Sequence, residues 1–172
     1  MFGRWLKGAG ETRAPEGAER LKEVVAEHLP GADAESVLVV TAIAGLLGTV
    51  AYADRNYSAD EEQRVRQELE RVHGMTRVGI DAICSALRAH IVEVSTVQAP
   101  RYSRLLVELA DRELRVEVLG VMVELAAADG EISVAEVNLL RQVTTALGLT
   151  QGDYNTAQEK HRERLTVLRK AT

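Results

Sequence analysis

"VAYADRNYSADEEQRV" at residues 50–65 and "LAAADGEISVAEVNLL" at residues 125–140 align without a gap. The aligned polar positions are Asp54 and Asp129, Ser58 and Ser133, and Glu61 and Glu136. An internal repeat of this kind indicates that the chain is built from two related units. Each copy leads from an apolar run into a charged one, so each is expected to join two helices.

Each copy can be interpreted as the end of one helix and the start of the next. Gly130 follows Asp129, and glycine accepts the positive φ with which a chain commonly leaves a helix. In each copy a serine precedes a glutamate by three positions, the spacing of a capping box. Tyr57 and Ile132 directly precede these serines, where an apolar side chain packs back onto the new helix. Helix capping alone accounts for both turns.

Divalent-ion binding is the alternative role of these turns. In the EF-hand pattern D-x-[DN]-x-[DN]-G-x5-E, Asp129, Gly130 and Glu136 would take the third acidic, the glycine and the final positions. Leu125 and Ala127 stand where the first two ligands would be, whereas calcium takes six to eight oxygens. A single turn is therefore no EF-hand. An ion would also need backbone carbonyls, water or the carboxylates of the other turn, and both roles stay open.

The apolar periodicity predicts an all-α fold of about eight helices and little or no strand. The expected helices span 16–29, 34–53, 59–73, 77–95, 102–110, 112–128, 134–147 and 151–169. They are expected to form two pseudo-symmetric four-helix repeats, 16–98 and 101–170, that share one core in a single domain, 16–172. Pro100 is expected to break the chain between the repeats. Residues 1–15 are expected to form a flexible N-terminal segment.

Residues 36–53 carry no charge over 18 residues, the lower limit of a transmembrane helix. Residues 111–128, their counterpart in the repeat, contain several charged side chains. We therefore expect 36–53 to be a central buried helix and the chain to have no transmembrane span. Cys84 lies in an apolar helical pattern and is expected to be a small buried hydrophobe. A single cysteine also suits a reducing compartment.

Composition and charge disfavour two broad functions. The net charge is -5 with scattered basic residues, whereas nucleic-acid binding needs a clustered positive face. The sequence has no zinc-protease, hydrolase, phosphate-loop or Cys-x-x-Cys motif, so we expect no enzyme. The start, "MFGRWLKGAGETRAPEG", lacks the apolar core of a signal peptide. Phe2 and Trp5 beside basic residues leave contact with a membrane surface or a protein partner open.

The two turns, "AYADRNYSADEE" and "AAADGEISVAE", resemble those of the TerB-like family. That family includes the tellurite-resistance TerB proteins and the N-terminal domain of DjlA-type co-chaperones. The resemblance covers about residues 34–170, and the first copy departs from the motif at Arg55 and Asn56. No His-Pro-Asp signature occurs, so the chaperone-recruiting activity of the co-chaperones is not carried over.

The resemblance implies a compact helical domain with an acidic cluster for a divalent ion such as calcium or magnesium. The implied metal ligands are Asp54, Glu61, Asp129 and Glu136. It further implies a non-enzymatic, cytoplasmic protein that associates with protein partners in a stress response such as tellurite resistance, with peripheral membrane association as a variant. The alternative is a helical scaffold or membrane-surface adaptor that binds no metal and whose acidic turns act only as caps.

Overall fold

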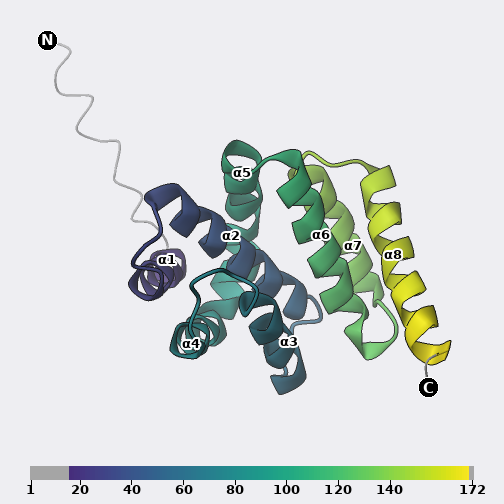
Figure 1. Cartoon of the computed structure of the whole chain (residues 1–172), viewed down its shortest axis with the longest axis horizontal. Coiled ribbons are helices and arrows are strands. Elements are labelled where there is room, and N and C mark those ends of the chain that lie inside the picture. The colour runs from purple at the N-terminus through teal and green to yellow at the C-terminus, as the bar shows by residue number, and fades with distance from the viewer. Residues whose placement is uncertain (1–15, 171–172) are drawn as a thin grey trace, which may run out of the picture.

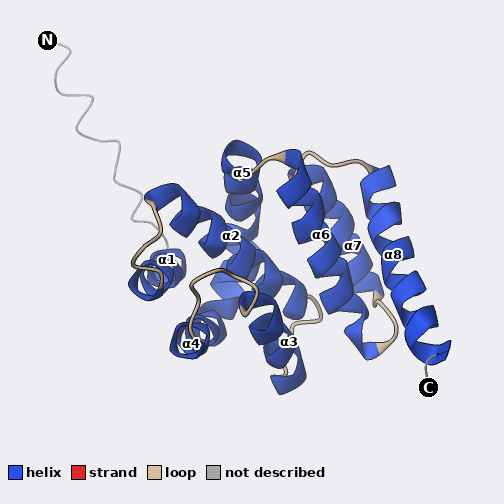
Figure 2. Ribbon diagram, in the orientation of Figure 1, coloured by secondary structure: helices blue, strands red, loops and turns tan. Residues whose placement is uncertain are grey.

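Eight α-helices and two short helical segments make up the described part of the chain (Figure 1, Figure 2). The computed structural model describes residues 16–170, without the side chains of Glu16, Asp129 and residues 164–170. The elements are α1 (Glu16–His28), α2 (Ala34–Ala51), α3 (Ala59–Leu69), α4 (Arg77–Glu93), the π-helical η1 (Val94–Gln98), α5 (Ala99–Leu109), α6 (Arg112–Ala126), the 3-10 helix η2 (Ala127–Asp129), α7 (Val134–Ala146) and α8 (Gln151–Lys170). Residues 16–170 contain no strand, and the predicted all-α class is confirmed. The N-terminal segment 1–15 lies outside the described residues.

The uncharged helix α2 lies at the centre of the fold. It packs against α1, α3, α4, α5, α6 and α7, and 61% of its 18 residues are buried. Within the described residues it is the one helix long and apolar enough, by length and composition, to cross a membrane. A core helix passes the same test, because burial inside a protein selects the same apolar side chains.

Side-chain caps set where most helices begin. The capping side chains of α2, α3, α4, α6 and α7 each accept a backbone N–H from the first turn of their helix; they are Asp33, Ser58, Thr76, Asp111 and Ser133. Such a cap satisfies one of the amides that a helix start leaves without a partner. Five short polar side chains therefore define where five of the described helices begin.

Pro100 does not break the chain, and that prediction was wrong. Residues 77–109 are helical throughout, and Pro100 lies in the first turn of α5, where a missing N–H and a fixed φ cost little. The helix changes direction earlier, at His90 with φ -124 and through η1. Figure 1 shows the result, with α4 viewed nearly along its axis and α5 upright. The two halves are thus joined by bent helix and not by a loop.

The first helices of the two halves, α1 and α5, pack against different partners. α1 packs mainly on α4, whereas α5, its counterpart in the repeat, packs mainly on α2. The other three helices of each half pack in the same way. In the first half α2 contacts α3 and α4, and in the second half α6 contacts α7 and α8. The cores of both halves meet where α2 contacts α6.

Candidate functional site

The first acidic turn joins α2 to α3. The exposed side chain of Asp54 accepts a hydrogen bond through Oδ1 from the backbone N–H of Asn56 at 2.8 Å. Arg55 between them has φ 65, in the left-handed region that a residue with a Cβ enters at a cost. The turn closes in the same conformation that glycine would adopt freely.

The second acidic turn joins α6 to α7 through η2. Gly130 ends η2 with φ 102, so the residue after the aspartate has a positive φ in both turns. Asp129 is the last residue of η2, and its side chain lies outside the described residues. Tyr57 in the first turn and Ile132 in the second are half-buried against the core.

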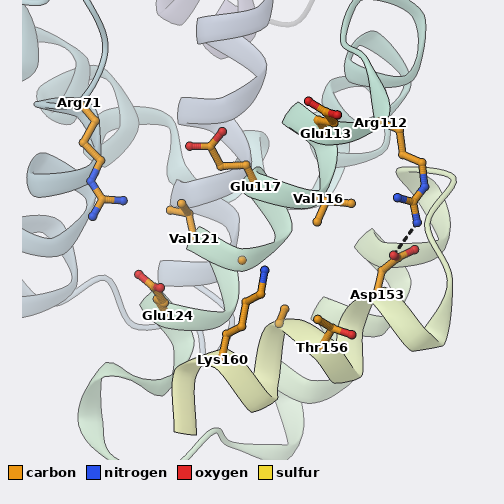
Figure 3. Close-up of a pocket in the computed structure, with 12 residues that line it drawn as sticks. Arg71, Arg112, Glu113, Val116, Glu117, Val121, Glu124, Asp153, Thr156 and Lys160 are labelled. Atoms are coloured by element: carbon orange, nitrogen blue, oxygen red, sulfur yellow. Dashed lines mark hydrogen bonds and ion pairs between the residues drawn. The ribbon is translucent and has the colours of Figure 1, made fainter. Parts of the chain in front are cut away.

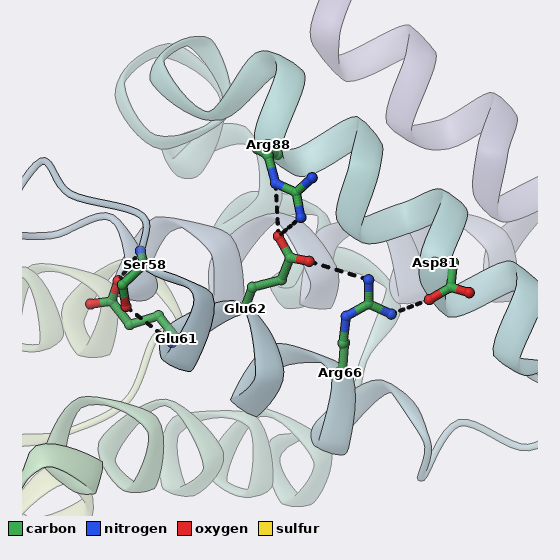
Figure 4. Close-up of polar contacts among 6 residues, drawn as sticks. All are labelled: Ser58, Glu61, Glu62, Arg66, Asp81 and Arg88. Carbon is green, nitrogen blue, oxygen red and sulfur yellow. Dashed lines mark hydrogen bonds and ion pairs between the residues drawn. The ribbon is translucent and has the colours of Figure 1, made fainter.

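Both turns contain a complete capping box. Ser58 donates its backbone N–H to Glu61 Oε2 at 2.7 Å, and the backbone N–H of Glu61 reaches Ser58 Oγ at 3.2 Å (Figure 4). Ser133 and Glu136 repeat the two bonds at the same distances. The capping interpretation is confirmed for both pairs. One carboxylate oxygen of each glutamate is therefore committed to holding a helix start.

The two turns border different parts of the molecule. Tyr52, Ala53 and Arg55 line a depression of about 160 Å³ against η1 and α7, whereas Gly130 and Glu131 line one of about 390 Å³ against α8. Among the described residues, no three His, Cys, Asp or Glu side chains gather closely enough to hold a metal ion. Asp54, Glu61 and Glu136 thus do not form a metal centre by themselves. Calcium takes six to eight oxygens, so an ion there would need further ligands.

A polar cluster that sequence reasoning missed joins α3 to α4 (Figure 4). The carboxylate of Glu62, only 7% exposed, accepts hydrogen bonds from Nε of Arg88 at 3.0 Å and from Arg66 at 3.2 Å. Arg66 also pairs with Asp81 at the start of α4. The Glu62–Arg66 spacing of four residues was the available signal, since such pairs meet on a helix surface. The hydrogen bond from Arg88 on α4 to Glu62 on α3 depends on how the two helices pack, so no sequence spacing predicts it.

Burial makes the single cysteine unreactive. The thiol of Cys84 is fully buried, and desolvation raises its pKa from 9.0 to about 11. Desolvation also raises the pKa of Tyr57, whose hydroxyl is buried without a hydrogen-bond partner among the described residues. A nucleophilic thiol needs the opposite shift, toward the thiolate. The prediction that Cys84 is a small buried hydrophobe is confirmed.

The largest of these surface depressions lies between α6 and α8 (Figure 3). It has a volume of about 480 Å³, and its floor includes Gly120, which has no side chain. One wall carries the glutamates of α6, and the other carries Lys160 of α8; the ion pair of Arg112 on α6 with Asp153 on α8, at 2.6 Å, joins the two walls. The backbone N–H and hydroxyl of Thr150, followed by Arg112, lower the pKa of the Asp153 carboxyl.

An apolar slot adjoins this depression on the side of α3. It has a volume of about 180 Å³ between α2, α3 and α6. Its apolar lining is Ile43, Leu47, Leu69, Val72, Leu114, Val118 and Val121. Arg71, Glu117 and Val121 line both the slot and the depression, so the two form one surface, which we call the α6 groove. Sequence reasoning did not identify it, because its walls come from four helices.

Comparison with known proteins gives one match. The family model described as "Tellurite resistance protein TerB" matches residues 40–159, a span that holds both acidic turns and most of the α6 groove. No curated protein and no solved structure matches the chain.

Proposed function

Because the chain belongs to the TerB family of tellurite resistance proteins, we propose that it is a non-enzymatic domain that binds a divalent ion at its acidic turns and associates with a protein partner. Calcium or magnesium is the expected ion, since carboxylate and carbonyl oxygens are the ligands these hard cations take. Association with the protein partner is proposed to serve a stress response such as tellurite resistance.

One observation carries the ion-binding part of the proposal. Asp54 and Asp129 occupy the same position in the two turns, each directly before a residue with positive φ. Neither aspartate takes part in the capping boxes, which consist of a serine and a glutamate. Helix capping therefore accounts for Glu61 and Glu136 but not for the repetition of the aspartate.

The ligand set supports weak binding. Asp54 is exposed and can supply a carboxylate. Backbone carbonyls of the turn and water would complete the coordination. Because the turn offers few charged ligands and is open to solvent, we expect a weak dissociation constant for calcium, about 10⁻⁴–10⁻³ M.

Isothermal titration calorimetry of the full chain with calcium, magnesium and zinc tests ion binding. We expect heat of binding for calcium or magnesium, and we expect the double variant Asp54→Asn with Asp129→Asn to lose it. The matched control is Glu27→Gln with Glu108→Gln, which also removes two exposed carboxylates, on α1 and α5, outside both turns. Absence of heat at millimolar ion for the wild type would contradict the proposal.

The metal-free alternative makes the opposite prediction. If the turns act only as caps of a helical scaffold or a membrane-surface adaptor, no ion alters the melting temperature. Ser58→Ala and Ser133→Ala would then still lower it, because the caps are independent of any ion.

The stress role is tested in cells. A host lacking its own copy is complemented with the wild type or with the Asp54→Asn, Asp129→Asn variant and exposed to tellurite. The proposal predicts better survival with the wild type than with the variant at equal expression. Equal survival of wild type, variant and empty host would contradict it. Fractionation of the same cells tests the proposed cytoplasmic location against peripheral membrane association.

A further inference from the structure

The α6 groove combines an apolar floor with an acidic edge. Glu113, Glu117 and Glu124 follow one another along the exposed side of α6 (Figure 3). The residues lining the slot and the depression include five carboxylates and three basic groups, a net charge of -2. Two of the basic groups, Arg71 and Arg112, are paired with Glu68 and Asp153. A segment that carries both apolar and basic side chains therefore complements this surface.

Residues 2–7 of the same chain, "FGRWLK", have this chemistry. They contain the only Phe and the only Trp of the protein, although large aromatic side chains usually contribute to cores and interfaces. Phe2, Trp5 and Leu6 have the sequence spacing i, i+3, i+4, which would bring them to one face if the segment bound as a helical turn. Arg4 and Lys7 supply two positive charges.

The tether between this segment and the fold is long compared with the spacing of packed helices. The ten residues from Leu6 to Glu16, the start of α1, span up to roughly 35 Å when extended. Two helix-to-helix spacings amount to roughly 20 Å, and α2 packs against both α1 and α6.

We propose that residues 2–7 dock in the α6 groove of their own chain, with Phe2, Trp5 and Leu6 over the apolar slot and Arg4 and Lys7 beside the glutamates of α6. Docking covers the half-buried apolar side chains of the slot and neutralises its acidic edge. The contact goes beyond the proposed function and does not depend on ion binding.

Trp5 reports on this contact because it is the only tryptophan. In the full chain we expect its fluorescence maximum at shorter wavelength than in urea-unfolded protein, and its quenching by acrylamide severalfold weaker. Both values should stay constant on dilution, since the segment and the groove belong to one molecule. A shift that fades on dilution would show that the segment sits on a second copy and would overturn the proposal.

Charge reversal tests the site. Glu113→Lys with Glu117→Lys should return Trp5 to the emission and quenching of an exposed tryptophan. The matched control, Glu27→Lys with Glu108→Lys, makes the same charge change at exposed positions on α1 and α5, outside the groove, and should keep the shift. Val121→Asp tests the apolar slot, with circular dichroism to verify that the helices remain.

A charge exchange distinguishes docking from loss of fold. Arg4→Glu with Lys7→Glu should abolish the shift, and combining it with Glu113→Lys and Glu117→Lys should restore it. An exposed Trp5 in the wild type, or a shift that no groove variant changes, would overturn the proposal. So would a shift that appears only with vesicles of phosphatidylserine and phosphatidylcholine, because the segment would then be a membrane anchor.

Discussion

The ring of Tyr102 on α5 lies directly on the backbone of Gly45 on α2, where a Cβ would collide with it. Tyr102 is 3% exposed, so the ring is enclosed between the two helices. Desolvation accordingly raises the pKa of its hydroxyl to about 12. This contact brings α5 of the second half onto the central helix of the first.

Gly45→Ala is expected to destabilise the fold by about 1–3 kcal/mol, because the added methyl group must displace a buried ring. Gly120→Ala is the matched control, since nothing lies within 4 Å of the Cβ it would add to α6. That change should stabilise the fold by about 0.5–1 kcal/mol, the helix propensity difference between the two residues. Urea unfolding of both variants measures the change in the free energy of unfolding. A change in the same direction for both variants would contradict the prediction.

Arg55→Gly is expected to raise the free energy of unfolding by roughly 0.5–1 kcal/mol. Arg55 has φ 65, and glycine adopts this conformation without the Cβ strain that arginine meets. Gly130→Ala in the second turn, at φ 102, should lower the free energy by a comparable amount. Thermal melts in buffer with a chelator keep any bound ion out of the comparison. A stabilising Gly130→Ala would contradict the positive φ of Gly130.

Glu62→Gln is expected to cost about 1–3 kcal/mol, because it weakens charge-assisted hydrogen bonds from Arg66 and Arg88 to a buried carboxylate. Asp81→Asn removes an acid that is 57% exposed in the same cluster and should cost less than about 1 kcal/mol. Denaturant unfolding of the two single variants tests this order. A larger loss of stability from Asp81→Asn than from Glu62→Gln would show that the exposed Arg66–Asp81 pair contributes more than the buried carboxylate of Glu62.

Stability should fall as the pH rises above 9 because of Cys84. Its pKa is about 11 in the folded chain and 9.0 ordinarily, so the thiol ionises in the unfolded state first, and the contribution present below pH 9 is lost toward pH 11. At pH 10 the loss is roughly 1 kcal/mol. Urea midpoints at pH 8 and 10 measure it. Cys84→Ala should show a smaller difference than the wild type.

The sequence predicted the helices well because their limits depend on neighbouring residues. Five helices begin at the predicted residue: Ala34, Ala59, Arg77, Arg112 and Val134. Each follows a short polar cap that can be recognised locally. The helix expected over 59–73 instead ends at Leu69, and the chain continues to Gly74 in i→i+3 turns. Pro100 was misread because proline starts helices as readily as it ends them.

Less of the candidate site followed from the sequence. Both capping boxes were predicted, since serine and glutamate three residues apart suffice to form one. The Glu62–Arg88 bond and the α6 groove were not, because each joins residues from separate helices whose relative positions come from packing. Metal binding by Asp54, Glu61, Asp129 and Glu136 stays a prediction.

The π turn η1 has a consequence for insertions and deletions. Its hydrogen bonds run from i to i+5, so it contains one residue more than an α-helical path would. Each residue of an α-helix turns the chain by about 100°. Loss of a single residue from Val94–Gln98 would therefore convert the π turn into an ordinary α-helical turn and leave α5 nearly in phase, whereas loss of a residue from α5 itself before Tyr102 would rotate that side chain away from Gly45. Between the two halves, η1 is thus the place where the chain can lose one residue without a change in how α5 packs on α2.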